Sequence, residues 1–190
     1  VRSRGLGDVY KRQEYKKTDE YALAKARQED ILYQSGFSNY TIVRPSVTYN
    51  TYRLQLGALE KENWLYRALK GRCIVFSNDI ADKYTAMTHG DDVAKAICAV
   101  IGKRECLKQS YNIVTDNSLK WQDILTIYLC AIEEFTGKCP KVVMSDETIK
   151  LKDKKFKYQV IYARRLNRKF DNTKIEKVYH EKFISPKEAV

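Results

Sequence analysis

The sequence lacks the features of disulfide-rich, zinc-binding and membrane-spanning proteins. Its 190 residues include two histidines and five cysteines, and no two cysteines have CxxC spacing. We therefore expect no structural zinc site, and an odd number of irregularly spaced cysteines excludes a secreted disulfide scaffold. The longest apolar run, residues 96–101, is far shorter than the roughly 18 residues that a membrane span needs. We expect a cytoplasmic protein without a membrane partner, whose cysteines are buried as small apolar side chains.

The formal net charge of +11 is unevenly distributed along the chain. Residues 141–190 carry 14 basic and seven acidic side chains, whereas residues 14–140 carry 17 and 16. A basic C-terminal quarter is compatible with a patch for a polyanion, or with a solvated face that counter-ions neutralise. We take the solvated face as the default interpretation and expect no nucleic-acid partner.

The first thirteen residues differ from the rest. Residues 1–7 show no apolar periodicity, and residues 8–13 resemble one translated reading frame of a transposon end used in sequencing-library preparation. We interpret residues 1–13 as an adapter-derived extension, and the alternative is a genuine N-terminal tail. Residues 14–190 are then one α/β fragment of a longer protein. Ser185-Pro186 reads as a helix start near the last residue, which suggests truncation there too.

Helix and strand patterns alternate along residues 14–190. The expected helices span residues 19–34, 56–70, 91–101, 118–135 (with Ser118 as the cap) and 146–157; the expected strands span 40–44, 73–76, 111–114 and 141–144; residues 158–162 fit a strand or a loop. This alternation, without internal repeats, predicts an α/β fold with some parallel pairing.

Tyr21-Ala-Leu-Ala-Lys25 places a phenol and an ammonium four residues apart on one helix face. An ammonium about 4 Å from a phenol stabilises the phenolate, so such a pair can act as a general base near neutral pH. Spacing alone is weak evidence, because the tyrosine and lysine contents predict about two such pairs by chance and two occur. The second is Tyr66 and Lys70, which we interpret as a surface pair. An incidental pair on a helix surface remains the alternative for Tyr21 and Lys25 as well.

The segments that follow Tyr21 and Lys25 distinguish them from the second pair. In order, these segments are Tyr40-Thr-Ile-Val-Arg44-Pro45, Thr88-His-Gly-Asp-Asp-Val-Ala94, Tyr111-Asn-Ile113 and Asp171-Asn-Thr-Lys-Ile175. The series resembles the extended short-chain dehydrogenase/reductases of the NAD-dependent epimerase/dehydratase family, in which a YxxxK helix precedes a strand ending in Arg-Pro. The resemblance runs from about Glu14 to the end of the chain, and it rests on the order of the segments rather than on any single motif.

The resemblance implies an α/β fold: the C-terminal part of a Rossmann-type doubly wound sheet plus a small α/β substrate lobe. It implies NAD or NADP as cofactor, a sugar or nucleotide-sugar substrate, and a homodimer as a compatible assembly. Tyr21 would act as base on a sugar hydroxyl, and Lys25 would hold the cofactor ribose. Pro45, Ser46 and Val47 would face the nicotinamide carboxamide.

Departures from the family pattern leave alternatives open. The family's Gly-rich phosphate loop and catalytic Ser/Thr lie upstream of YxxxK, so we expect residues 14–190 alone to be inactive and to bind NAD weakly. Val47 stands where sugar epimerases of this family often carry Asn. The arginine with which they bind the diphosphate would fall at about Thr85, so this chain has a threonine there. His89 is interpreted as a structural residue at a helix start. The alternatives are an atypical, non-catalytic relative that binds RNA or another polyanion through its basic C-terminal lobe, and a plain interaction domain.

Overall fold

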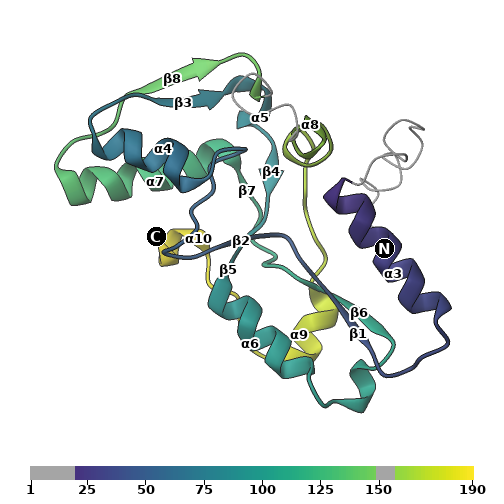
Figure 1. Ribbon diagram of the computed structural model, residues 1–190. Helices are drawn as coiled ribbons and strands as arrows, with labels where there is room; N and C mark the ends of the chain where they lie inside the picture. The colour runs from purple at the N-terminus through teal and green to yellow at the C-terminus, as the bar shows by residue number, and fades with distance from the viewer. Residues whose placement is uncertain (1–19, 149–156) are drawn as a thin grey trace.

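Short strand pairs organise the computed structural model, which describes residues 20–148 and 157–190 (Figure 1). The parallel pairs are β1 (Thr41–Pro45) with β6 (Gln109–Ile113), β2 (Val47–Tyr49) with β5 (Met87–His89), and β3 (Ile74–Ser77) with β8 (Val142–Ser145), while β4 (Tyr84–Thr85) and β7 (Leu119–Lys120) are antiparallel. Parallel neighbours require long crossover connections, and helices lie within these connections. The expected α/β fold with parallel pairing is confirmed.

The helices over residues 21–34, 90–100 and 121–136 lie close to the expected ranges, whereas those over 78–81 and 173–179 are not predicted by the sequence pattern. The α-helices are α3 (Tyr21–Gln34), α4 (Lys61–Leu69), α5 (Asn78–Ala81), α6 (Gly90–Val100), α7 (Trp121–Thr136), α8 (Lys157–Gln159), α9 (Thr173–Tyr179) and α10 (Pro186–Ala189), with a 3-10 turn η1 (Arg104–Cys106) and a π-helical turn η4 (Val160–Arg164). Residues 1–13 and most of the helix expected over 146–157 lie outside the described residues.

Three local expectations are wrong. Helix α4 begins at Lys61 rather than residue 56, because Leu56 and Leu59 form a backbone bridge before it. Ser118 does not cap α7; instead, the Asp123 carboxylate accepts the Lys120 N–H at 3.0 Å and the helix begins at Trp121. Residues 158–162 are helical, within α8 and η4, rather than a strand or a loop.

Helices α4 and α7 lie on one side of the β3–β8 pair (Figure 1), and we call these four elements the lobe. The larger of the two hydrophobic cores lies mostly within it. Trp64 of α4 and Tyr128 of α7 are both buried, and their rings stack with centroids 4.7 Å apart. The indole N–H of Trp64 also donates to the Leu54 carbonyl at 3.0 Å. Aromatic burial with a satisfied polar tip is a strong packing element, so α4 and α7 form a stable pair.

A second core lies between α6, α9 and the β1–β6 pair. His89 precedes α6, and its Nδ1 accepts the Asp91 N–H at 3.4 Å, in keeping with its expected structural role. The buried carboxylate of Asp92 accepts the Ile184 N–H at 2.7 Å, which holds the segment before α10 against this core.

The cysteines only partly follow expectation. Cys106 is buried, but Cys98, Cys130 and Cys139 are exposed on the lobe and α6 surfaces. The prediction of buried small apolar side chains is therefore wrong for these three, because they fall on the outward faces or beyond the ends of their helices. Within the described ranges, no helix is both long and apolar enough to cross a membrane.

Candidate functional site

Tyr21 and Lys25 lie together on the solvent face of α3. The helix begins at Tyr21, close to the expected start at residue 19, and the Glu20 carboxylate caps it by accepting the Ala22 N–H at 2.8 Å. The Lys25 Nζ lies 5.7 Å from the centre of the Tyr21 ring and donates to the Gln28 side chain at 3.1 Å. The Tyr21 side chain is 74% exposed, so its hydroxyl is accessible to a ligand.

A small aromatic cluster from the C-terminal part of the chain seats α3. Leu23, between the two candidate residues in sequence, is 4% exposed and packs against Tyr158 of α8 and Tyr162 of η4. The two tyrosine rings stack with centroids 5.9 Å apart and an interplanar angle of 8°. Because Leu23 points away from the face that carries Tyr21 and Lys25, this contact positions the pair without covering it.

An ion pair connects α3 to β1. The Arg44 guanidinium donates from Nε to a Glu29 carboxylate oxygen at 2.8 Å, and its Nη2 contacts the second oxygen. Hydrogen bonding to Glu29 raises the pKa of Arg44 above its ordinary value. Arg44 directly precedes Pro45, so this bidentate pair links the Tyr–Lys helix to the segment expected to face a cofactor.

Pro45, Ser46 and Val47 form the junction between β1 and β2. Pro45 is exposed and Ser46 is half-buried, whereas Val47 is 6% exposed and packs in the lobe core. The side chain of Val47 therefore points into the core, and only its backbone is available to a ligand.

Ser46 lies just beyond β1 and carries a polar atom that is unsatisfied within the described residues. Its hydroxyl oxygen is buried, and no hydrogen-bond partner for it exists among residues 20–148 and 157–190. The residue follows the carboxyl end of β1, which is parallel to β6, and α/β sheets bind their ligands at such ends. A buried, unpaired hydroxyl at this edge fits a polar group such as the carboxamide of a nicotinamide cofactor.

Thr85 and Arg164 are buried polar residues, and the sequence pattern does not single out Arg164. Thr85 is 2% exposed, so a buried hydroxyl stands near the position where the resemblance implies an arginine. Arg164, 4% exposed, donates from Nε to the Gly57 carbonyl at 2.9 Å and from Nη2 to the Gln55 side chain at 3.0 Å. Burial, followed by the charge of Arg168, lowers the pKa of Arg164 to about 10. Nothing in the local sequence distinguishes Arg164 from its basic neighbours, so only the fold identifies it.

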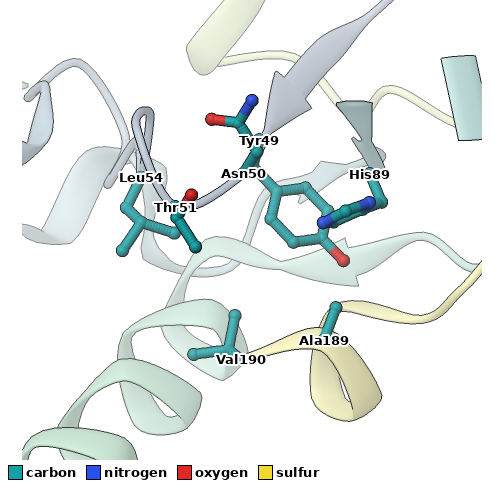
Figure 2. A pocket seen from close by; sticks show the side chains of 7 residues that line it. All are labelled: Tyr49, Asn50, Thr51, Leu54, His89, Ala189 and Val190. Atoms are coloured by element: carbon teal, nitrogen blue, oxygen red, sulfur yellow. The ribbon is translucent and has the colours of Figure 1, made fainter. Parts of the chain in front are cut away.

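A separate hollow of about 160 Å³ lies between the end of β2, the start of α6 and the end of α10 (Figure 2). Its lining residues are Tyr49, Asn50, Thr51, Leu54, His89, Ala189 and Val190. The Tyr49 and His89 rings meet edge to face with centroids 5.3 Å apart, and burial raises the pKa of Tyr49 above its ordinary value. None of the predicted site residues lines this hollow, so it is not the site of the proposed Tyr–Lys chemistry.

The parallel strand pairs and their covering helices have the Rossmann-like fold of NAD-dependent nucleotide-sugar epimerases. The chain is similar to the UDP-glucuronic acid 4-epimerase of Bacillus cereus in complex with UDP-glucuronic acid and NAD, with a TM-score of 0.64 and 15% identity over 89% of this chain and 49% of that one. It is also similar to the UDP-glucose 4-epimerase of Thermus thermophilus in complex with NAD, with a TM-score of 0.60 and 16% identity over 88% and 49% of the two chains.

A third similar structure is the UDP-glucose 4-epimerase of Thermotoga maritima with UDP-glucose, with a TM-score of 0.58 and 18% identity over 89% and 48% of the two chains. The chain thus spans about half the length of these enzymes. The sequence matches no protein-family model and no curated protein.

Proposed function

We propose that this chain is the C-terminal part of an NAD(P)-dependent epimerase, dehydratase or reductase that acts on a sugar, most simply a nucleotide sugar. The observation that carries the proposal is the fold, which extends over 89% of the chain in the comparison with an epimerase that binds NAD and UDP-glucuronic acid. The Tyr–Lys pair on an exposed face of α3 supports it independently. The protein would take a small-molecule substrate, and a homodimer is compatible with it.

Tyr21 is the proposed base. Its exposed phenol can approach a sugar hydroxyl, and as the phenolate it would take the hydroxyl proton onto its own oxygen. The Lys25 ammonium, held over the same helix face, would stabilise the phenolate and bind the cofactor ribose. NAD(P)+, when bound, would accept the hydride that leaves the carbon bearing this hydroxyl, and that carbon would become a carbonyl.

Pro45, Ser46 and Val47 are the proposed cofactor-facing segment. The unpaired Ser46 hydroxyl can hydrogen-bond a carboxamide, and the backbone groups beside it can complete the contact. The Glu29–Arg44 ion pair would hold this segment in a fixed position relative to α3. Because a buried threonine occupies the position near which the family carries an arginine, we propose a substrate whose phosphate groups are bound differently from those of standard family members.

The test is a Tyr21→Phe substitution in the complete protein that contains this chain, assayed with NAD or NADP and UDP-sugars. Loss of a general base typically lowers kcat by roughly 10²–10⁴-fold. Tyr66→Phe is the matched control, because Tyr66 and Lys70 have the same spacing and the same cation–ring contact, at 5.9 Å. Unchanged turnover in Tyr21→Phe would refute the catalytic assignment, and an equal loss in both variants would show that the effect is not specific to α3.

A further inference from the structure

The segment 157–165, here called the strap, lies between the lobe and α3 (Figure 1). It consists of α8, η4 and the residue that follows them. Tyr158 and Tyr162 of the strap pack against Leu23, the residue midway between the two members of the Tyr–Lys pair. The strap therefore contacts α3 at the turn that carries the proposed catalytic pair.

Two successive arginines bind the end of the strap to the opposite side. The Arg164 Nε donates to the Gly57 carbonyl at 2.9 Å, and its guanidinium lies 5.5 Å from the ring centre of Trp121 in α7. The Arg165 guanidinium contacts Asp79 of α5, the helix that directly follows β3. Its Nε and Nη2 both lie 2.7 Å from the same Asp79 oxygen, Oδ2.

The Asp79 carboxylate is fully engaged by donors of this chain. Besides Arg165, the Thr148 N–H donates to both carboxylate oxygens at 3.1 Å, and the Thr148 hydroxyl donates to Oδ1. The side chain of Asp79 is 17% exposed and that of Arg165 is 34% exposed. A charge-assisted pair that is partly removed from water holds its geometry better than a fully exposed one, so this contact is an anchor for the strap.

The π-helical turn η4 explains how one short segment faces two partners. Tyr158, Tyr162 and Arg165 have the spacing i, i+4, i+7, which places residues on one face of a regular α-helix. In the strap, however, the Arg165 N–H donates at 3.0 Å to the carbonyl of Val160, five residues earlier. The turn thus holds one residue more than an α-helical turn, which moves Arg165 around the helix axis. The tyrosines face α3 as a result, and the arginine faces Asp79.

The position of α3 depends strongly on this seat. Leu23 is the buried residue of α3, and the Glu29–Arg44 ion pair holds the helix two turns further along. Rare π-helical turns are frequent at functional sites, and η4 lies directly behind the Leu23 contact. A shift of the strap would therefore move the first turns of α3, which carry Tyr21 and Lys25.

We propose that the strap positions the Tyr–Lys pair for catalysis, and that Arg165 and Asp79 are positioning residues of the reaction. They fix the strap relative to the lobe, and the strap fixes α3 through Leu23. The inference rests on the proposed function of Tyr21 and Lys25. It adds two residues that act through the helix rather than on substrate or cofactor.

The experiment is Arg165→Gln in the complete protein that contains this chain, assayed with NAD and UDP-glucuronic acid. We expect kcat to fall by roughly 10–100-fold, because a misplacement of about 1 Å can cost about 10²-fold in rate. KM should change by less than about twofold, since Arg165 would not bind the substrate. Arg165→Lys keeps a positive charge beside Asp79 and should recover much of the lost kcat. Lys83→Gln is the matched control, because it removes an ion pair with Asp82 just beyond α5 and leaves the strap untouched.

Amide hydrogen exchange in the same variants tests the seat of α3 without any turnover. Arg165 is partly exposed, so Arg165→Gln should keep the fold, with faster exchange in α3 and unchanged protection in α7. Unchanged exchange in α3 would overturn the proposal, and so would equal loss of protection in α7, which would indicate general destabilisation. A rise in KM at constant kcat would overturn it as well, because it would place Arg165 at the substrate.

Tyr21→Phe separates this inference from the proposed function. Lost turnover in Tyr21→Phe with full turnover in Arg165→Gln would overturn the role of the strap and leave the proposed function standing. Full turnover in Tyr21→Phe would overturn the proposed function and, with it, the catalytic role of the strap.

Discussion

Helices α7 and α3 are of similar length but differ in how many of their side chains are buried. Helix α7 buries one face of five side chains, namely Trp121, Ile124, Leu125, Tyr128 and Ile132. Helix α3 buries Leu23 alone among its 14 residues, and it exposes large apolar side chains such as Ile31, 66% exposed, and Tyr33, 50% exposed. Hydrophobic burial therefore fixes α7, whereas a few specific contacts fix α3.

This difference concerns function, because the weakly held helix carries the proposed catalytic pair. The contacts of α3 are the Leu23 cluster with Tyr158 and Tyr162 and the Glu29–Arg44 ion pair. Segments with few buried apolar contacts open locally at a lower free-energy cost than the core. We therefore expect α3 to be the less stable of the two helices, and the following substitutions test that order.

The largest effect is expected for Trp64→Ala, which removes the ring that α4 stacks on Tyr128 of α7. Replacing a buried aromatic residue with alanine costs about 3–5 kcal/mol, and here the Leu54 carbonyl also loses its donor. The free energy of unfolding measured in urea should fall by that amount. Phe135→Ala is the control on α7, because Phe135 is 84% exposed and its loss should change stability by less than about 0.5 kcal/mol. Equal effects of both would show that the lobe core is not packed as described.

A smaller and more local effect is expected for Leu23→Ala. Removing a buried leucine costs about 2 kcal/mol at the low end of the usual range, and the Leu23 cluster is small. Amide hydrogen exchange should become faster in α3, while α7 keeps its protection. The control is Ile31→Ala, which removes an exposed side chain of the same helix and should leave exchange unchanged. Faster exchange in α7 as well would mean that the two helices unfold as one unit.

The smallest effect is expected for Glu29→Gln. An ion pair whose members are partly exposed contributes about 0.2–1 kcal/mol and weakens as salt is added. The variant should loosen α3 slightly at low salt, with the difference from the unmodified protein vanishing at about 1 M salt. Glu62→Gln changes an exposed glutamate of α4 by the same chemistry and serves as the control. A difference that persists at high salt would indicate that Glu29 acts through packing rather than charge.

Local sequence patterns predicted some of these features well. The 3,4 spacing of apolar residues located α7 within a few residues, since this periodicity is a direct consequence of helix geometry. Tyr21 and Lys25 share a face for the same reason. The patterns failed at residues 158–162, which are typical of a strand but form a helix. In this helix Tyr158 stacks on Tyr162, and both pack against Leu23. They also missed β2 and β5, because strands of three residues are too short to show a period.

The sequence by itself determined where most elements lie, that Tyr21 and Lys25 are neighbours on one helix, and that basic residues are concentrated in the last quarter. Only the tertiary structure decided which strands pair, that Arg44 ties α3 to β1, and that Arg165 meets Asp79. The physical reason is the sequence separation over which each kind of interaction acts. Backbone geometry acts over three or four residues and leaves a local pattern, whereas strand pairing and ion pairing join residues that are distant in the chain and leave none.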